Sequence, residues 1–195
     1  MARLRRAAYE ERLRRVRLLV MDVDGVLTGG GIFYCEDDLE GKTFHVRDGS
    51  AMFIARLIEL RTAVITARSS KVVERRFTEL PVDYLRQGEK DKVAACRAIQ
   101  EAGGFADEEV AYVGDDLIDL PLLEHVGVAI AVADAHPKVL ERADWITERG
   151  GGEGAAREVV DDIVTARGLW EEVLDDYRRR QGAPATTAAA RSEVR

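Results

Sequence analysis

Apolar runs alternate with amphipathic segments along most of this chain, and the pattern indicates an α/β fold. Residues 18–21 are all apolar, as expected for a strand that is buried on both faces of a parallel sheet. Similar apolar runs predict further strands over residues 62–66, 82–85, 109–113, 126–132 and 145–147. Because helical segments separate these runs, we expect a doubly wound parallel sheet flanked by helices.

Helical spacing of the apolar positions predicts the connecting helices. We expect them over residues 50–60, 67–80, 90–102, from about 155 onward, and near 169–180. One connection differs from the others. Two short β-prone runs, residues 32–34 and 42–46, flank an acidic turn, which predicts a β-hairpin over residues 29–46 directly after the first strand.

The two ends of the chain differ in composition from the middle. Residues 1–17 contain seven arginines, and Leu4, Ala8, Leu13 and Val16 lie between them. We interpret this segment as a basic helix that is solvated and has a weak docking face, rather than as an anion-binding site. Residues 18–180 form the main domain. Residues 181–195 are rich in Ala and Thr and are predicted to be disordered.

Composition narrows the class of protein. The chain has 195 residues, of which 46% are hydrophobic, enough for a real core. Its net charge of −7 argues against a general nucleic-acid binder. The two cysteines, Cys35 and Cys96, cannot form a disulfide framework and fit a reducing compartment. With no apolar run of membrane-spanning length and no secretory leader, we expect a cytoplasmic protein without a membrane partner.

Polar residues follow three of the predicted strands. Asp22 and Asp24 end the first, Thr66 ends the second, and an acidic stretch at 115–119 ends a third, while Lys92 lies at a helix start. Taken alone, each has a simpler interpretation. The first two acids could mark the exit of a strand, Thr66 could cap a helix, the acidic stretch could be a turn, and Lys92 could be a surface lysine. Since the carboxyl ends of parallel strands lie at one edge, all these groups can converge there.

The stretch DVDGVLT at 22–28, with the strand-terminal Thr, the Lys and GDDLID at 114–119, resembles the four motifs of the haloacid-dehalogenase superfamily of phosphohydrolases. The resemblance implies a nucleophilic Asp22, a general acid–base Asp24, and Mg²⁺ as cofactor. It implies Mg²⁺ contacts from the Asp22 and Asp115 carboxylates and from the Asp24 carbonyl. It further implies a supporting role for Asp116 and Asp119, and phosphoryl contacts from Thr66 and Lys92.

The spacing of these motifs points to one branch of that superfamily. The gaps between the motifs hold a hairpin, a helix or a strand, and have no room for a cap domain. Residues 18–180 resemble the 3-deoxy-D-manno-octulosonate 8-phosphate (KDO 8-phosphate) phosphatase family. The stretches that carry this resemblance include residues 44–49, 87–88, 112–121 and 151–158. The resemblance implies a homotetramer in which the hairpins assemble and a neighbouring subunit helps to cover the site.

The same resemblance implies which residues bind the sugar acid. Arg68 and Lys71 match sugar-binding positions, and Arg76 matches another arginine of the family; exposed helix charge is the alternative for the first two. Two residues depart from the family pattern. Ala67 replaces the glycine of Thr-Gly-Arg, and Ala51 replaces a glycine that follows Asp-Gly. We expect the added methyl groups to leave catalysis in place and to affect the sugar preference.

The sequence therefore predicts a Mg²⁺-dependent phosphatase that hydrolyses KDO 8-phosphate through an aspartyl-phosphate, in lipopolysaccharide precursor synthesis. One alternative keeps this chemistry but acts on the phosphate of a nine-carbon keto-sugar acid. A second alternative is a non-catalytic oligomeric scaffold with the same fold. The complete set of acids, Thr and Lys argues against the scaffold, since nothing structural requires all of them. Other hydrolase motifs, such as His-Glu-x-x-His and Gly-x-Ser-x-Gly, are absent from the sequence.

Overall fold

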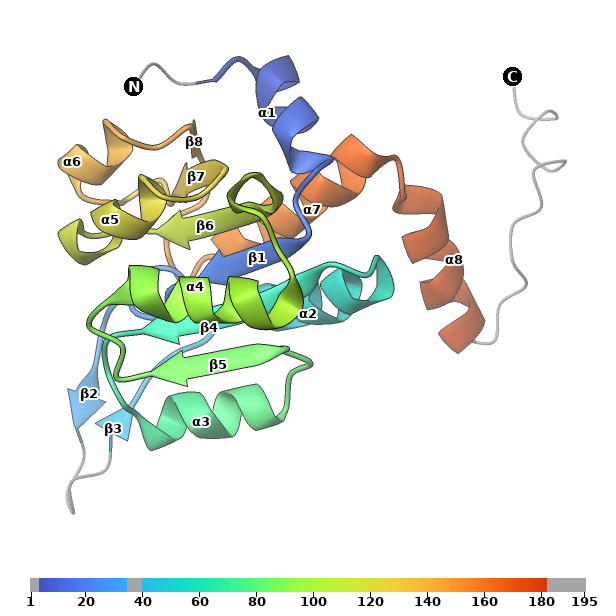
Figure 1. Cartoon of the computed structure of the whole chain (residues 1–195). Coiled ribbons are helices and arrows are strands. Elements are labelled where there is room, and N and C mark those ends of the chain that lie inside the picture. The colour runs from blue at the N-terminus through green and yellow to red at the C-terminus, as the bar shows by residue number, and fades with distance from the viewer. Residues whose placement is uncertain (1–3, 35–39, 182–195) are drawn as a thin grey trace, which may run out of the picture.

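The centre of the computed structural model is a six-stranded parallel sheet with the order β5-β4-β1-β6-β7-β8 (Figure 1). The structure describes residues 4–34 and 40–181. The strands are β1 (Leu18–Met21), β4 (Arg61–Thr66), β5 (Tyr84–Gln87), β6 (Val110–Gly114), β7 (Val128–Ala131) and β8 (Trp145–Ile146). This is the doubly wound sheet that the alternating pattern predicts.

Helices cover both faces of the sheet (Figure 1). The longer ones are α1 (Arg6–Leu13), α2 (Val46–Leu57), α3 (Lys71–Thr78), α4 (Lys92–Gly103), α7 (Ala155–Arg167) and α8 (Trp170–Arg180). Short turns form α5 (Leu120–Leu123), α6 (Pro137–Leu140), η2 (Asp107–Glu109) and η3 (Leu117–Asp119). Helices α1, α2 and α7 pack together on one face, and α4 and α5 pack on the other.

Strand β1 is the centre of the core. All four of its residues are fully buried, and it pairs with β4 on one side and β6 on the other. Burial on both faces of the sheet therefore explains the apolar run that predicted this strand. Met21 pairs with Val64 and with Val113, so the three strands end at nearly the same level.

The predicted hairpin is present, but its second strand lies earlier than expected. Strand β2 (Phe33–Tyr34) pairs antiparallel with β3 (Glu40–Gly41), not with residues 42–46. Helix α2 begins at Val46, several residues before the predicted start at 50. The cause is local: the His45 side chain accepts a hydrogen bond from the Arg47 N–H at 3.2 Å and caps the helix.

Other predicted boundaries are wrong by a few residues; β7, for example, begins at Val128 rather than at 126. Strand β5 begins at Tyr84 rather than at 82, because it is paired along β4 with Ala63 opposite Tyr84. Helix α3 begins at Lys71 rather than at 67. Before it, the Ser70 N–H donates to the Gln87 side chain at 2.9 Å, which holds the chain extended next to β5.

The basic N-terminal helix docks more firmly than predicted. Tyr9 and Leu13 are fully buried, and the Tyr9 ring stacks on Trp145 with their centroids 4.4 Å apart. Ala8 is exposed, because the buried stripe follows Tyr9 and Leu13 at a spacing of one helical turn. The tail predicted for 181–195 lies outside the described residues, apart from Gln181.

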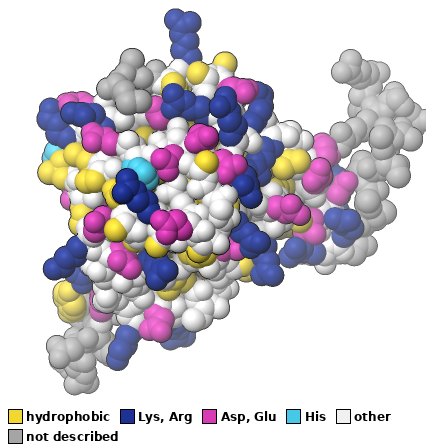
Figure 2. All heavy atoms as spheres, in the orientation of Figure 1, with side chains coloured by type: hydrophobic (Ala, Val, Ile, Leu, Met, Phe, Trp, Pro, Cys, Tyr) yellow, Lys and Arg dark blue, Asp and Glu magenta, His cyan; other side chains and the backbone are white. Residues whose placement is uncertain are grey.

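The surface is highly charged, with both signs intermixed. Figure 2 shows basic and acidic side chains side by side over the face that it presents. Many of them form ion pairs within a helix, such as Arg180 with Asp176 at 2.6 Å. Among the described residues, no helix has the length and apolar character needed to cross a membrane.

Candidate active site

The predicted catalytic residues meet at the carboxyl edge of the sheet. Asp22 follows β1 directly, and Asp115 follows β6, its neighbour on one side. Thr66 ends β4, the neighbour on the other side. The chain leaves β1 toward β4 and later returns to β6, so these residues lie at the topological switch point where open α/β sheets bind ligands.

Lys92 joins the acids from a different element. It is the first residue of α4, where Asp91 caps the helix by accepting from the Ala94 N–H at 2.9 Å. Its side chain is buried, and its Nζ lies 3.0 Å from Asp22 Oδ1 and 2.6 Å from Asp119 Oδ1. Burial lowers the pKa of Lys92, but the two carboxylates outweigh it and raise the pKa above its ordinary value.

Asp119 is fully buried and has all its acceptor positions in use. Its Oδ1 accepts from Lys92 Nζ at 2.6 Å and from the Tyr112 hydroxyl at 2.6 Å. Its Oδ2 accepts from the backbone N–H of Asp115 at 2.8 Å and of Asp116 at 3.2 Å. A carboxylate has about four such acceptor sites. Asp119 therefore holds the loop and the lysine, and has no lone pair left for a metal ion.

The side chains of Asp22 and Asp115 have the features of a cation site. One carboxylate oxygen from each of Asp22, Asp115 and Asp119 lies within 4.8 Å of the others. Asp115 Oδ1 is buried without a hydrogen-bond partner. Burial and the neighbouring carboxylates raise the pKa of Asp115 to about 8. Burial and the charge of Asp119 raise the pKa of Asp22 to about 6, although the ammonium of Lys92 lowers it. Oxygen ligands with uncompensated charge suit a hard divalent cation.

Two glycines let the loops approach this acidic centre. Gly25 has a φ of +92°, and a Cβ built on it would lie 2.0 Å from Asp115 Oδ2. Gly151 passes over the same turn, and its Cβ would lie 1.8 Å from the Gly25 carbonyl oxygen. A side chain at either position would push the loops apart. The glycines therefore set how closely the β1 loop, the Asp115 loop and the 150–154 loop pack.

Asp24 lies slightly further out, where the hairpin meets the sheet. Its Oδ1 is bonded to the Nζ of Lys42, and its Oδ2 lies 3.8 Å from Arg68 Nε. The Arg68 guanidinium also contacts the Tyr34 hydroxyl at 3.4 Å and Glu40 at 3.7 Å. The sequence-predicted Asp24 and Arg68 are thus brought together, and the hairpin supplies the rest of their surroundings.

The remaining predicted sugar-binding residues lie apart from this centre. Lys71 starts α3 and is exposed, and Ala67 lies in the half-buried turn after β4. The Arg76 guanidinium lies over the Phe44 ring at 5.7 Å and close to Gly49. Its ion pair is with Glu79, and no contact among the described residues joins it to the catalytic aspartates. The Thr66 hydroxyl accepts from the Arg68 N–H at 3.3 Å, and the cap position of α3 belongs to Ser70 rather than to Thr66.

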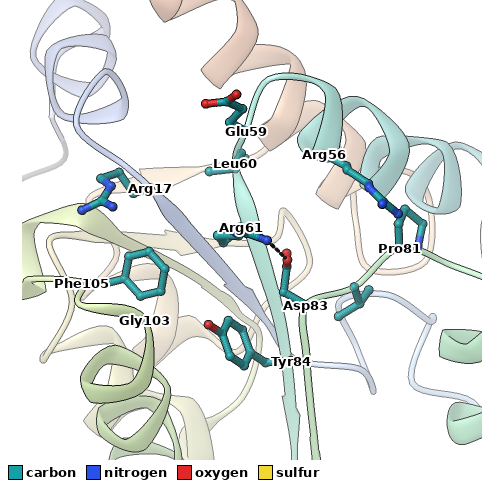
Figure 3. Close-up of a pocket in the computed structure, with 11 residues that line it drawn as sticks. Arg17, Arg56, Glu59, Leu60, Arg61, Pro81, Asp83, Tyr84, Gly103 and Phe105 are labelled. Carbon is teal, nitrogen blue, oxygen red and sulfur yellow. Dashed lines mark hydrogen bonds and ion pairs between the residues drawn. The ribbon is translucent and has the colours of Figure 1, made fainter.

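A cavity of about 1010 Å³ lies at the opposite, amino-terminal edge of the sheet (Figure 3). Arg61, at the start of β4, pairs there with Asp83 at 2.6 Å, and the rings of Tyr84 and Phe105 form one wall. None of the predicted site residues lines it. The convergence of acids, Lys92 and Thr66, rather than this cavity, marks the candidate active site.

Sequence reasoning missed several residues of the site. Tyr112 is a strand residue, and nothing in its pattern distinguishes it from a core aromatic. Lys42 and Glu40 alternate on the return strand of the hairpin, and this spacing places them on one face. That alternation next to the DVDG stretch is the signal that could have found them.

Comparisons with known proteins agree with this geometry. A model of the haloacid dehalogenase-like hydrolases matches residues 62–158. The chain is 46% identical over 157 residues to the 3-deoxy-D-manno-octulosonate 8-phosphate phosphatase of Escherichia coli K12, an alignment that covers 80% of this chain and 84% of the relative. The chain belongs to the KDO 8-phosphate phosphatase family. The resemblance inferred from the motifs is therefore confirmed.

Solved structures of similar proteins show the same fold. A hydrolase of haloacid-dehalogenase subfamily IIIA from Legionella pneumophila aligns with a TM-score of 0.86 and 38% identity, covering 89% of this chain and 95% of that chain. The KDO 8-phosphate phosphatase of Moraxella catarrhalis aligns with a TM-score of 0.84 and 33% identity, covering 87% and 98%. The latter structure contains magnesium, phosphate and a KDO molecule.

Proposed function

We propose that this chain is a Mg²⁺-dependent phosphatase that hydrolyses KDO 8-phosphate to KDO and inorganic phosphate. The observation that carries the proposal is the meeting of Asp22, Asp115 and Lys92 at one edge of the sheet, where the 3.0 Å Lys92–Asp22 pair lies within a buried acidic cluster. Membership of the KDO 8-phosphate phosphatase family supports the substrate. A scaffold would not need a buried charge cluster of this kind, since such clusters are costly to fold.

The reaction divides between the two aspartates of the DVDG stretch. An oxygen of Asp22 attacks phosphorus, the bond from phosphorus to the sugar oxygen breaks, and Asp24 gives a proton to the leaving oxygen. Water then attacks the phosphorus of the aspartyl-phosphate while Asp24 takes a proton from it. Asp22 is regenerated and inorganic phosphate leaves. Thr66 and Lys92 hold the phosphoryl oxygens, and the ammonium of Lys92 offsets their charge.

We propose Mg²⁺ as the cation of the site, held by the carboxylates of Asp22 and Asp115 and by the backbone carbonyl of Asp24. Bound there, the cation would neutralise the charge of the phosphate dianion and of the acids that face it. The unpartnered, buried Asp115 Oδ1 supports this assignment. Asp119, with its acceptor sites filled, and the exposed Asp116 would support the loop without binding the metal.

Arg68 is the best placed of the predicted sugar-binding residues. Its side chain is 44% exposed and lies beside Asp24, so it can reach a carboxylate on the substrate. Arg76 and Lys71 lie further away and would need a neighbouring subunit or a large substrate to take part. The phosphate of a nine-carbon keto-sugar acid is the second candidate substrate, because Ala67 and Ala51 replace two glycines of the family pattern.

We further propose a homotetramer assembled through the hairpins. Phe33 and Tyr34 are 55% and 67% exposed at the edge of the molecule, which is a large apolar area for a two-stranded ribbon. Burial between subunits would shield them and cover the open active site. We also propose a cytoplasmic location, as the sequence predicts.

The deciding experiment is phosphate release from a panel of phosphate esters, with Mg²⁺ and with a chelator. The panel contains KDO 8-phosphate, the phosphate of a nine-carbon keto-sugar acid, hexose phosphates and p-nitrophenyl phosphate. We expect the highest kcat/KM for KDO 8-phosphate and no turnover without the cation. Equal kcat/KM for all sugar phosphates would contradict the assigned substrate, and no hydrolysis of any ester would contradict the enzyme.

A further inference from the structure

The side chain of Lys42 is completely enclosed, although lysine is almost never buried without a reason. It follows β3 of the hairpin, and its Nζ is bonded to Asp24 Oδ1 and lies 3.4 Å from Glu40 Oε1. Removing an ammonium group from water costs several kcal/mol unless carboxylates compensate for it. A second enclosed cation besides Lys92 therefore lies within reach of the catalytic aspartates.

The two oxygens of Asp24 have different surroundings. Oδ1 faces the enclosed Lys42, with the Thr28 hydroxyl at 3.5 Å on the same oxygen. Oδ2 faces Arg68, whose Nε is 3.8 Å away and whose side chain is 44% exposed. One oxygen is thus bonded to an enclosed lysine, whereas the other faces an arginine that is partly open to solvent.

The chemistry of an ammonium group makes this asymmetry useful. Lys has three N–H donors and no acceptor, so Oδ1 of Asp24 must act as an acceptor wherever Lys42 contacts it. A proton carried by Asp24 then belongs on Oδ2. In the proposed reaction, that proton leaves Oδ2 for the sugar oxygen as its bond to phosphorus breaks. In the second half, a proton of water returns to Oδ2 as the water oxygen bonds to phosphorus.

We propose that Lys42 is a positioning residue that orients the Asp24 carboxylate so that Oδ2 delivers the proton to the leaving sugar oxygen. This inference rests on the proposed phosphatase function and deepens it. Lys42, Glu40 and Tyr34 all come from the hairpin, so the hairpin would both cover the site and set the orientation of its acid. The competing explanation is purely structural: Lys42 would only balance the charges of Glu40 and Asp24.

The test uses leaving groups of different quality on the full-length protein with Mg²⁺. Lys42→Met keeps the length of the side chain and removes the donor. A sugar phosphate needs a well-placed acid, whereas p-nitrophenyl phosphate has a leaving group that needs little protonation. We expect kcat on the sugar phosphate to fall about 100-fold, as for loss of a general acid, and kcat on the aryl ester to fall less than about 3-fold. KM should change little on either ester.

A double-mutant cycle separates positioning from a structural role. If Lys42 acts through Asp24, the variant Asp24→Asn/Lys42→Met should be no slower on the sugar phosphate than Asp24→Asn alone. Additive losses in this cycle would overturn the proposal, and so would equal losses of Lys42→Met on both esters. Lys138→Met is the matched control, because the Lys138 side chain is 64% exposed and its ammonium pairs with Glu141 rather than with Asp24. It should match the wild type on both esters.

Two further variants keep the test decisive if Lys42→Met does not fold. Lys42→Gln retains an N–H donor and should recover part of the lost kcat on the sugar phosphate. Glu40→Gln/Lys42→Met removes the facing charge as well, and should fold while still showing the selective loss. A wild-type chain that hydrolyses neither class of ester would contradict the proposed phosphatase function itself. If the wild type is active and Lys42→Met has the same leaving-group preference, only the proposed role of Lys42 is contradicted.

Discussion

The Nζ of Lys92 lies 3.0 Å from Asp22 Oδ1, within a cluster in which one buried ammonium faces two buried carboxylates. The second carboxylate, from Asp119, binds the same ammonium at 2.6 Å and also accepts from Tyr112. Asp119 thus holds Lys92 in place independently of Asp22. The lysine can therefore remain at the site while Asp22 changes its charge or its covalent state.

This arrangement predicts the behaviour of Asp22→Asn. Loss of the nucleophile should lower kcat by about 10⁴-fold or more, as for other nucleophile deletions. The melting temperature without Mg²⁺ should stay close to that of the wild type, because Lys92 keeps its bond to Asp119. Hydrolysis assays and thermal melts measure the two effects. Steady-state turnover by the purified variant, above that of a mock purification, would contradict a covalent role for Asp22.

The acidic centre also predicts an unusual pH dependence of stability. The folded-state pKa of Asp115 is raised to about 8 and that of Asp22 to about 6, well above the ordinary value for Asp near 4. Between about pH 4 and pH 8, these two carboxyl groups therefore retain protons in the folded state that they have released in the unfolded state. Without metal, the free energy of unfolding should therefore fall as the pH rises from about 4 to 8.

Mg²⁺ should reverse this trend, because the cation binds the ionised carboxylates and takes the place of the protons. We expect the increase in melting temperature on adding Mg²⁺ to be small at pH 5 and largest near pH 8. In Asp115→Asn, the metal-free protein should melt higher at pH 8 than the wild type, and Mg²⁺ should have little effect. An increase that is independent of pH would contradict the assignment of Asp115 to the cation site.

The close approach of Gly25 to Asp115 predicts a separable effect on metal binding. Gly25→Ala combines a strained backbone at φ +92° with a Cβ 2.0 Å from Asp115 Oδ2. We expect Mg²⁺ affinity to fall about 10- to 100-fold, as for other residues that hold metal ligands in place. Gly104→Ala is the matched control: it has φ +66° and no atom within 4 Å of the added Cβ. It should lose about 1–2 kcal/mol of stability and retain metal affinity. Calorimetric titration with Mg²⁺ compares the two.

The exposed hairpin aromatics predict the assembly state. Phe33→Ser/Tyr34→Ser should dissociate the proposed tetramer into smaller species in sedimentation velocity experiments. It should also raise KM for the sugar phosphate more than KM for p-nitrophenyl phosphate, because the neighbouring subunit would no longer cover the sugar. Tyr177→Ser on α8 is the control, since Tyr177 is similarly exposed, at 43%, on a different element. A wild-type monomer with full activity at assay concentration would rule out this role of the hairpin.

The order of the elements and the set of acids could be predicted from the sequence. Apolar runs reveal strands that are buried on both faces. Asp22 and Asp115 directly follow such strands, Asp24 lies two residues after Asp22, and Thr66 is the last residue of another strand. Their convergence could be inferred because parallel strands end at a common edge. Boundaries such as the start of α2 and of β5 could not, because single hydrogen bonds and strand register decide them.

The role of each acid, in contrast, depends on contacts that appear only in the folded protein. Asp119 and Asp115 belong to the same loop motif, yet one has every acceptor site filled and the other has a buried oxygen without a partner. Tyr112 gave no signal, since a tyrosine in a strand has many ordinary uses, and the alternation of Glu40 and Lys42 indicates a shared face but not the burial of the lysine. Burial and direction of hydrogen bonds depend on contacts between residues far apart in the chain, and sequence spacing carries no record of them.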